Sequence, residues 1–325
     1  MSSPEPTGDL PAPNPVRGAL SPRSLRLLAF SLSVILLAAA VFALAGHRNE
    51  LAHSWSAARA APVWLVLAIV FLPLLNWAIT SAMFWTLTRR FGNVGPWEMS
   101  ALIGSAWLLN MLPLKPGLVG RIAYHKAISG IPIATSLLVT VTALLSGGVG
   151  IVIALAAQLA FDPQLRSIAP PAVLFPAAAL VLALALIPGL LIAWRNRSVG
   201  RPAFCAGGAI AIAIALRVAD THVWAVRYFL AFMLIAHDQP YGVCVVVAAV
   251  SQIAGQSPIP LGFREWAVGV SSGVLRPGGQ AIGAAAAVPG LTVDIVCRAA
   301  EICCALPVGI VSTLWIFRQL RRKAA

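Results

Sequence analysis

The sequence predicts an all-α polytopic membrane protein. Of its 325 residues, 59% are hydrophobic and only 10% are charged, whereas a soluble domain carries about 25% charged residues. The apolar residues form long runs separated by short basic segments, a pattern typical of membrane-spanning helices and not of the alternating strands of a membrane barrel. This composition excludes a water-soluble enzyme and a disordered protein.

The first element is a leader over residues 1–26. It contains six prolines and three arginines, a composition that favours a disordered, basic segment on the cytoplasmic side of the membrane. It does not resemble a signal peptide, because the apolar run behind it is too long and no small-residue cleavage site follows.

Eight apolar segments follow the leader, and we expect six of them to cross the membrane. A span needs about 20 apolar residues, but the third and seventh segments are short and end in prolines. Each is followed by a weakly apolar helix, so we expect re-entrant helical hairpins over 99–131 and 242–279, where protein or a water-filled cavity covers the broken backbone. The segments are 27–46, 62–87, 99–114, 132–160, 170–193, 203–234, 242–260 and 280–316.

The distribution of Lys and Arg supports this topology. If all eight segments crossed, the two sides of the membrane would carry equal numbers of these residues. With two hairpins and both termini in the cytoplasm, the cytoplasmic side carries twelve and the external side three, as the positive-inside rule requires. The cytoplasmic segments are then 1–26, 88–98, 194–202 and 317–325, and the external ones are 47–61, 161–169 and 235–241.

This topology divides the membrane portion into two halves of opposite orientation. The first repeat covers 27–160, the second covers 161–316, and a basic cytoplasmic tail occupies 317–325. Each half contains span, span, hairpin and span. Inverted repeats whose broken helices meet near the midplane are typical of transporters, and the breaks indicate the binding site.

Both hairpin breaks contain the order Pro, Pro, Gly, Arg. The first comprises Pro113, Pro116, Gly117 and Arg121, and the second comprises Pro258, Pro260, Gly262 and Arg264. With Asn110, Glu265 and the pair Arg298 and Glu301, these residues resemble the flippase-like integral membrane family named for the transmembrane domain of lysylphosphatidylglycerol synthase, which the multiple peptide resistance factor of bacteria carries.

The resemblance covers about residues 27–316 and has two departures. Many members carry an acidic residue near the position of Gly120, and many carry an Arg or Glu pair on the next helix, where this chain has 139–142. The first half-site is therefore less acidic than usual. Because no soluble domain follows residue 316, the resemblance implies the lipid-moving half alone, in the bacterial inner membrane, without aminoacyl-transferring activity.

Three basic residues at the breaks are candidates for contact with a lipid phosphate. Arg121 and Arg264 are expected at the start of the second helix of each hairpin, where the helix N-terminus also attracts anions. Lys115 lies at the first turn itself. The alternatives are that the arginines snorkel or bind backbone carbonyls, and that Lys115 is an interfacial anchor.

Charged residues in the last helix form a second group of candidates. Asp294, Arg298 and Glu301 are spaced i, i+4 and i+7, so they share one helix face. They could line a head-group or proton-coupled site, or clamp neighbouring helices. Glu265 could bind a cationic head group, accept a proton or neutralise an arginine.

Uncharged polar residues next to the breaks complete the candidate site. Asn110 and Gln256 could line a polar cavity or hydrogen-bond to the freed backbone. In the apolar segment 203–234, Arg217 and Asp220 are spaced i, i+3 and are expected to pair with each other.

These observations favour a lipid flippase-like transporter for a charged-head lipid, whether a phospholipid, an aminoacylated phospholipid or a polyprenyl-phosphate-linked species. The alternative is a non-transporting membrane subunit that docks a lipid- or glycan-modifying enzyme on basic cytoplasmic loops. No catalytic, metal or nucleotide motif is visible, so we expect no enzyme activity and no cofactor. The partners expected are membrane lipids with anionic or aminoacylated head groups, with a synthase or a second copy of the chain as further possibilities. The positive-inside topology accounts for the net charge of +13, so no nucleic-acid partner is expected.

Overall fold

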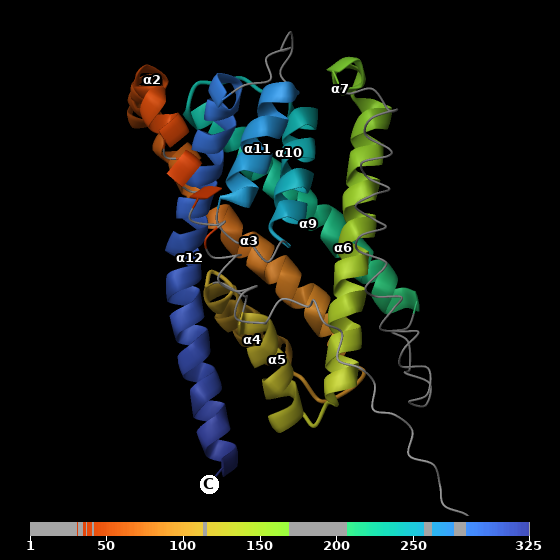
Figure 1. Ribbon diagram of the computed structural model, residues 1–325. Coiled ribbons are helices and arrows are strands. Elements are labelled where there is room, and N and C mark those ends of the chain that lie inside the picture. The colour runs from red at the N-terminus through yellow and green to blue at the C-terminus, as the bar shows by residue number, and fades with distance from the viewer. Residues whose placement is uncertain are drawn as a thin grey trace, which may run out of the picture.

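The structure is a computed structural model, and every element in its described part is a helix (Figure 1). The described residues are 31, 35, 36, 38–40, 42–112, 116–168, 207–256, 262–275 and 284–324. Four helices are long and apolar enough to cross a membrane, which confirms the all-α membrane character. They are α3 (Val63–Thr88), α6 (Ile133–Phe161), α9 (Gly207–Leu234) and α12 (Ala284–Ala324).

These four helices match the predicted spans 62–87, 132–160, 203–234 and 280–316. The predicted leader 1–26, the span 170–193 and much of the span 27–46 lie outside the described residues. Helix α12 continues through Ala324 and so includes most of the segment expected as a tail. Its last turns are rich in Arg, Gln and Leu, which are good helix formers.

Four short helices form two consecutive pairs. The first pair is α4 (Pro96–Leu109) and α5 (Pro116–Ala127), and the second is α10 (Tyr241–Ala254) and α11 (Phe263–Val274). A helix of 14 residues is about 21 Å long, too short for a hydrocarbon core of about 30 Å. In Figure 1 the α4–α5 pair lies at the end of the molecule where α12 terminates, and the α10–α11 pair lies at the opposite end.

Local sequence explains where the short helices begin. Pro96 and Pro116 occupy the first helical position of α4 and α5, where the missing N–H is not needed. Helix α11 follows Gly262, whose positive φ of 85° suits glycine. The Glu265 side chain accepts a hydrogen bond from the Gly262 N–H at 2.7 Å and so caps this helix.

Two helices were not predicted, α2 within residues 47–61 and α7 within residues 161–169. Both ranges were expected as external connections, but they contain α2 (Arg48–Ala60) and, directly after α6, the six-residue α7 (Pro163–Ile168). In α2 the exposed Trp55 ring lies under the guanidinium of Arg59, with 5.1 Å between the ring centre and Cζ. Its mixture of polar and apolar residues hides it from a search for long apolar runs.

The contacts between helices follow a paired pattern. At the centre, α3 packs against α9. In this pattern α3, α4, α5 and α6 correspond in order to α9, α10, α11 and α12. The contacts of α3 with α4, α6 and α12 are then matched by those of α9 with α10, α12 and α6. Likewise, the contacts of α4 with α5 and α12 and of α5 with α6 are matched by those of α10 with α11 and α6 and of α11 with α12. Every one of these helix–helix contacts therefore has a counterpart in the other half, except the contacts that α2 and α7 make.

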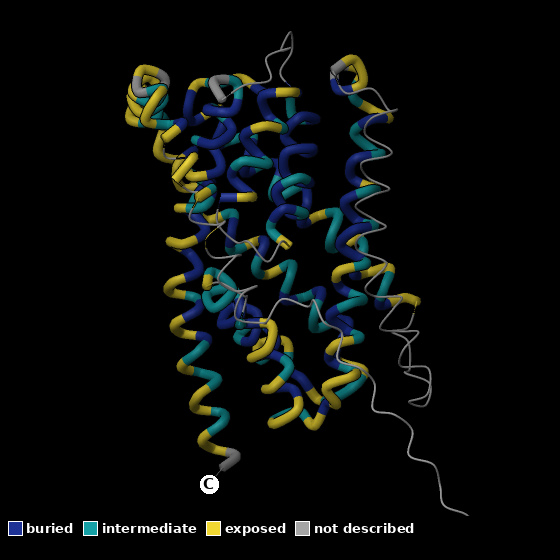
Figure 2. Tube along the Cα trace, viewed as in Figure 1, coloured by how far each residue is buried: buried dark blue, intermediate teal, exposed yellow. Residues whose placement is uncertain are grey.

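The largest apolar core surrounds α9 and α10. Helix α10 is buried along almost its whole length, whereas much of the surface of α2 and of the C-terminal part of α12 is exposed (Figure 2). Helices α11 and α12 approach so closely that a Cβ added at Gly290 would collide with Ser272. Small residues allow such close packing between membrane helices.

Candidate functional site

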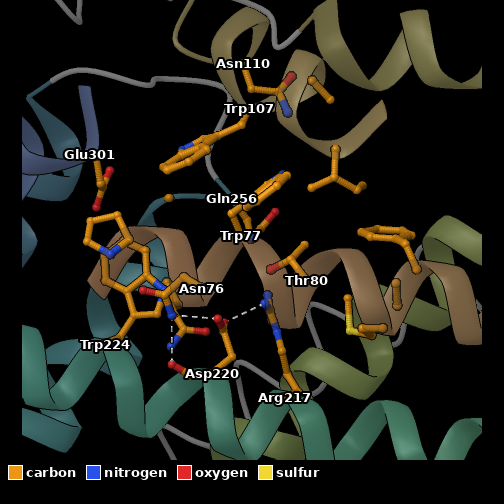
Figure 3. A pocket seen from close by; sticks show the side chains of 18 of the residues that line it. Asn76, Trp77, Thr80, Trp107, Asn110, Arg217, Asp220, Trp224, Gln256 and Glu301 are labelled. Atoms are coloured by element: carbon orange, nitrogen blue, oxygen red, sulfur yellow. Dashed lines mark hydrogen bonds and ion pairs between the residues drawn. The ribbon is translucent and has the colours of Figure 1, made fainter. Parts of the chain in front are cut away.

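A cavity of about 520 Å³, whose mostly apolar walls carry several charged side chains, lies between the two short helix pairs. It is lined by residues of α3, α4, α5, α6, α9, α10, α11 and α12. Figure 3 shows Trp107 and Asn110 from the end of α4 on one side, and Arg217 and Asp220 of α9 on the opposite side. Asn76 and other residues of α3 lie between them. The cavity is therefore built from both halves of the chain.

Arg264 is the centre of a buried charge cluster on the α11 and α12 side. Its guanidinium donates two hydrogen bonds to Oδ1 of Asp294, at 2.9 and 3.1 Å, and two to the carboxylate of Glu301, at 3.1 and 3.2 Å. Tyr228 of α9 donates its hydroxyl proton to Asp294 and also contacts the Ser251 hydroxyl at 2.8 Å. The charge of Arg264 is therefore balanced by protein carboxylates.

Glu301 connects this cluster to two further arginines. Arg227 of α9 donates to Glu301 at 2.9 Å, and Arg298 lies 3.4 Å from it. Glu301 thus ties α12 to α9 and α11, as expected of an interhelical clamp. Removing one partner of such a buried ion pair costs about 3–5 kcal/mol, because the other charge is left uncompensated.

The network continues through Asn76 of α3. Its side-chain oxygen accepts a hydrogen bond from Arg227 at 3.2 Å, and its side-chain nitrogen donates to Asp220 at 2.7 Å. Asp220 in turn pairs with Arg217 at 2.9 Å, which confirms the pairing predicted from their spacing. Figure 3 shows Asn76 bound to Asp220, which in turn pairs with Arg217. Through its hydrogen bond from Arg227, the same amide links this ion pair on α9 to the cluster on α12.

Trp224 of α9 supports two of these arginines. The Cζ atoms of Arg227 and Arg264 lie 4.4 and 4.9 Å from the Trp224 ring. A guanidinium near the face of an indole ring is attracted by its quadrupole. Trp224 also lines the cavity, so its ring helps to position Arg227 and Arg264 at the cavity surface.

Arg121 of α5 stands in a different environment on the first half's side of the cavity. It is buried, donates a hydrogen bond to the Thr140 hydroxyl at 2.7 Å, and lies 3.8 Å from the centre of the Phe84 ring. The Thr140 hydroxyl in turn donates a hydrogen bond to the Ser136 carbonyl. Among the described residues, Arg121 forms no ion pair with a carboxylate.

Six of the predicted site residues line the cavity, namely Asn110, Arg121, Gln256, Arg264, Arg298 and Glu301. Asp294 is buried behind Arg264. Glu265 does not line the cavity, because its carboxylate caps α11. Lys115 lies outside the described residues.

The expected position of Arg121 at a helix start is wrong. Pro116 begins α5, so Arg121 is the sixth residue of that helix, beyond its first turn. Arg264 is the second residue of α11, as expected, but the anions next to it are Asp294 and Glu301. The helix N-terminus therefore assists neither arginine in binding an external anion in this arrangement.

Sequence analysis missed the uncharged members of the site. Asn76, Thr140 and Tyr228 lie inside apolar segments and carry no charge that would draw attention to them. Asn76 had a usable signal, since an amide in the middle of a membrane span is costly unless it is hydrogen-bonded. The stacking of Trp224 on two arginines has no sequence signal, because it depends on how α9 meets α11.

The cavity can attract an anion. Five arginines line it, and the only carboxylates in the network are Asp220, Asp294 and Glu301. In the part of the chain that the structure describes, no group of three or more His, Cys, Asp or Glu side chains is placed to hold a metal ion.

Comparison with protein-family models, with curated proteins and with solved structures finds no match. The fold and the cavity therefore define the chain only as a helical membrane protein with a buried, arginine-rich site. The resemblance to the flippase-like family rests on the motif residues and stays a prediction.

Proposed function

We propose that the chain is a lipid flippase-like transporter, which moves a charged lipid head group through the cavity while the acyl chains stay in the bilayer. The observation that carries this proposal is that five arginines line a cavity between two broken helix pairs, against three carboxylates in the same network. A charge at the centre of a membrane helix costs about 3 kcal/mol by insertion scales. Three of the five arginines, Arg121, Arg227 and Arg264, are buried, which is a strong reason to assign this cavity a function.

The proposal includes a topology of six spans and two re-entrant hairpins, arranged as an inverted repeat in the inner membrane with both termini in the cytoplasm. The α4–α5 and α10–α11 pairs lie at opposite ends of the molecule (Figure 1), as hairpins entering from opposite sides would. The matched contacts of the two halves also support it. Inverted repeats with a site at their interface are a transporter architecture.

In this mechanism the head group enters the cavity and contacts Arg121, while Asn110 and Gln256 offer hydrogen bonds from the ends of α4 and α10. The cluster around Arg264 holds α9, α11 and α12 together. Opening alternately to each leaflet requires one side of the cavity to move relative to this clamp.

Lipid translocation in proteoliposomes tests the proposal. Purified protein is reconstituted with a fluorescent anionic lipid, and the rate at which the dye becomes accessible to an external quencher is compared with empty vesicles. We expect faster translocation with the wild type. Arg121→Gln should lower that rate about tenfold, since it removes a charge-assisted hydrogen bond to the head group.

Arg318→Gln is the matched control, because Arg318 is exposed near the end of α12. It should translocate lipid as fast as the wild type. If folded wild-type protein moves neither anionic nor aminoacylated lipids, the transporter proposal fails. A non-transporting subunit that docks a lipid- or glycan-modifying enzyme is then the better hypothesis.

A further inference from the structure

The charge balance of the cavity narrows the class of ligand. We infer that it takes a dianionic phosphate monoester in preference to a monoanionic phosphodiester or a cationic head group. This inference rests on the proposed function and specifies the substrate of the same site. It is carried by the number of charges in the network and by the hydrogen-bond donors that no protein group uses.

The described network has two more positive than negative charges. Arg217 pairs with Asp220, while Arg227, Arg264 and Arg298 share Asp294 and Glu301. Arg121 adds a fifth positive charge against these three negative ones. A ligand with two negative charges would therefore neutralise the site.

Unused donors lie on the same walls. Arg121 donates one described hydrogen bond, to Thr140, although a guanidinium has five N–H groups. Arg217 and Arg227 also line the cavity, but their Nε–H groups are enclosed by protein atoms and lie out of reach of a ligand. A ligand rich in acceptors could therefore bind the N–H groups of Arg121 that Thr140 does not use.

The two halves of the molecule suggest where the phosphate binds. In the second half, Arg264 is held by two carboxylates. In the first half, Arg121 donates its described hydrogen bond to the uncharged Thr140. A phosphate beside Arg121 would supply the negative charge that protein groups supply to Arg264.

The chemistry of the phosphate separates the candidate ligands. A monoester carries about −1.5 to −2 charges at neutral pH and has three acceptor oxygens. A diester carries one negative charge and has two free oxygens. An aminoacylated head group brings an ammonium group, which the five arginines would repel. The cavity volume of about 520 Å³ lies in the usual range for small-ligand sites, roughly 300–1,000 Å³.

A binding experiment in detergent tests this inference directly. Trp77, Trp107 and Trp224 line the cavity, so tryptophan fluorescence can report its occupation. The probes are dioleoyl phosphatidic acid, dioleoyl phosphatidylglycerol and dioleoyl lysylphosphatidylglycerol, which share their acyl chains. We expect phosphatidic acid to bind about tenfold more tightly than phosphatidylglycerol, the equivalent of one additional charge-assisted contact, and the lysyl lipid to bind most weakly.

Arg121→Gln should reduce the preference for phosphatidic acid to less than about threefold, because the contact that distinguishes the second charge is lost. Arg318→Gln should keep the wild-type preference. The melting temperature shows whether Arg121→Gln folds. If it does not, Arg121→Lys is used instead, because it keeps the charge and should keep part of the preference.

Inorganic phosphate distinguishes a lipid from a free anion. If inorganic phosphate displaces phosphatidic acid only at concentrations far above that of the lipid, the ligand is a lipid phosphate. If inorganic phosphate binds as tightly as phosphatidic acid, the ligand is a free anion and not a lipid. Equal affinity for phosphatidic acid and phosphatidylglycerol overturns the inference, but the proposed function stands if both lipids are translocated. If folded protein neither binds nor translocates any of the three lipids, both fail.

Discussion

The two short helix pairs each place one arginine at the cavity, but they treat its charge in opposite ways. Arg264 of α11 is neutralised by Asp294 and Glu301 of α12. Arg121 of α5 donates to a hydroxyl and lies over an aromatic ring, and among the described residues it forms no ion pair with a carboxylate. A buried arginine that the protein neutralises serves packing, whereas one that it leaves without a carboxylate can accept an anion from outside.

The second helix pair is also packed more tightly than the first. Helix α10 is buried along most of its length, and α11 lies closely against α12. In α5 only Gly117, Arg121, Tyr124 and His125 are buried. The second pair is therefore the scaffold of the site, and the first pair carries its binding residue on a less enclosed helix.

Glu301→Ala should have the largest effect, because it breaks the neutralised side. It leaves Arg227 and Arg264 without this carboxylate, which should lower the free energy of unfolding by about 3–5 kcal/mol. Thermal or denaturant unfolding in detergent measures the loss. Asp238→Ala is the control, because Asp238 is exposed between α9 and α10; an equal change in both variants would contradict the proposed clamp.

Thr140→Glu should make the first half resemble the second. A carboxylate beside Arg121 would neutralise it, so we expect lipid translocation to fall about tenfold or more while the protein stays folded. Thr140→Gln has a side chain of the same size without the charge. If the Gln variant is as inactive as the Glu variant, crowding rather than neutralisation explains the loss.

Gly117→Ala tests how firmly the first pair is packed. A Cβ at Gly117 would collide with the backbone of Ala106 in α4, and overpacking of this kind typically costs about 1–3 kcal/mol. The melting temperature should fall accordingly. Gly120→Ala is the matched control on the same helix, since no atom lies within 4 Å of its added Cβ; it should leave the melting temperature unchanged or raise it, because alanine favours the helix.

Arg121→Lys should have the smallest effect. The ammonium group keeps the charge that attracts a phosphate but not the planar fork, so affinity should fall about threefold at most. Arg264→Lys should destabilise the protein more, since Arg264 donates four hydrogen bonds to two carboxylates. Binding and melting measurements on both variants check this order, and a larger loss of stability in Arg121→Lys would reverse the comparison.

The sequence predicted the helices better than it predicted the site. Long apolar runs identify α3, α6, α9 and α12, and prolines identify the two short pairs, because both signals are local. Helix α2 was missed because its apolar residues are few. Asp294 and Glu301 could be placed on one face of a helix by their spacing, but their partner on α11 could not.

The parts of the site that could not be predicted depend on long-range packing. Asn76 connects two arginine clusters only because α3 crosses α9. Glu265 looked like a site residue, but its distance of three residues from Gly262 makes it a helix cap. That Arg121 has no carboxylate partner among the described residues depends on which residue of α6 faces α5, and spacing alone does not determine that.

The hydrogen bond between Asn76 and Asp220 also has a consequence for how the protein is made. The two residues are 144 positions apart, and chains are synthesised at about 5–20 residues per second. Asn76 therefore enters the membrane roughly 7–30 s before its partner exists. During that interval its amide must bind water, a lipid head group or the insertion machinery, and the first half of the chain completes its polar interior only after the second half has been translated.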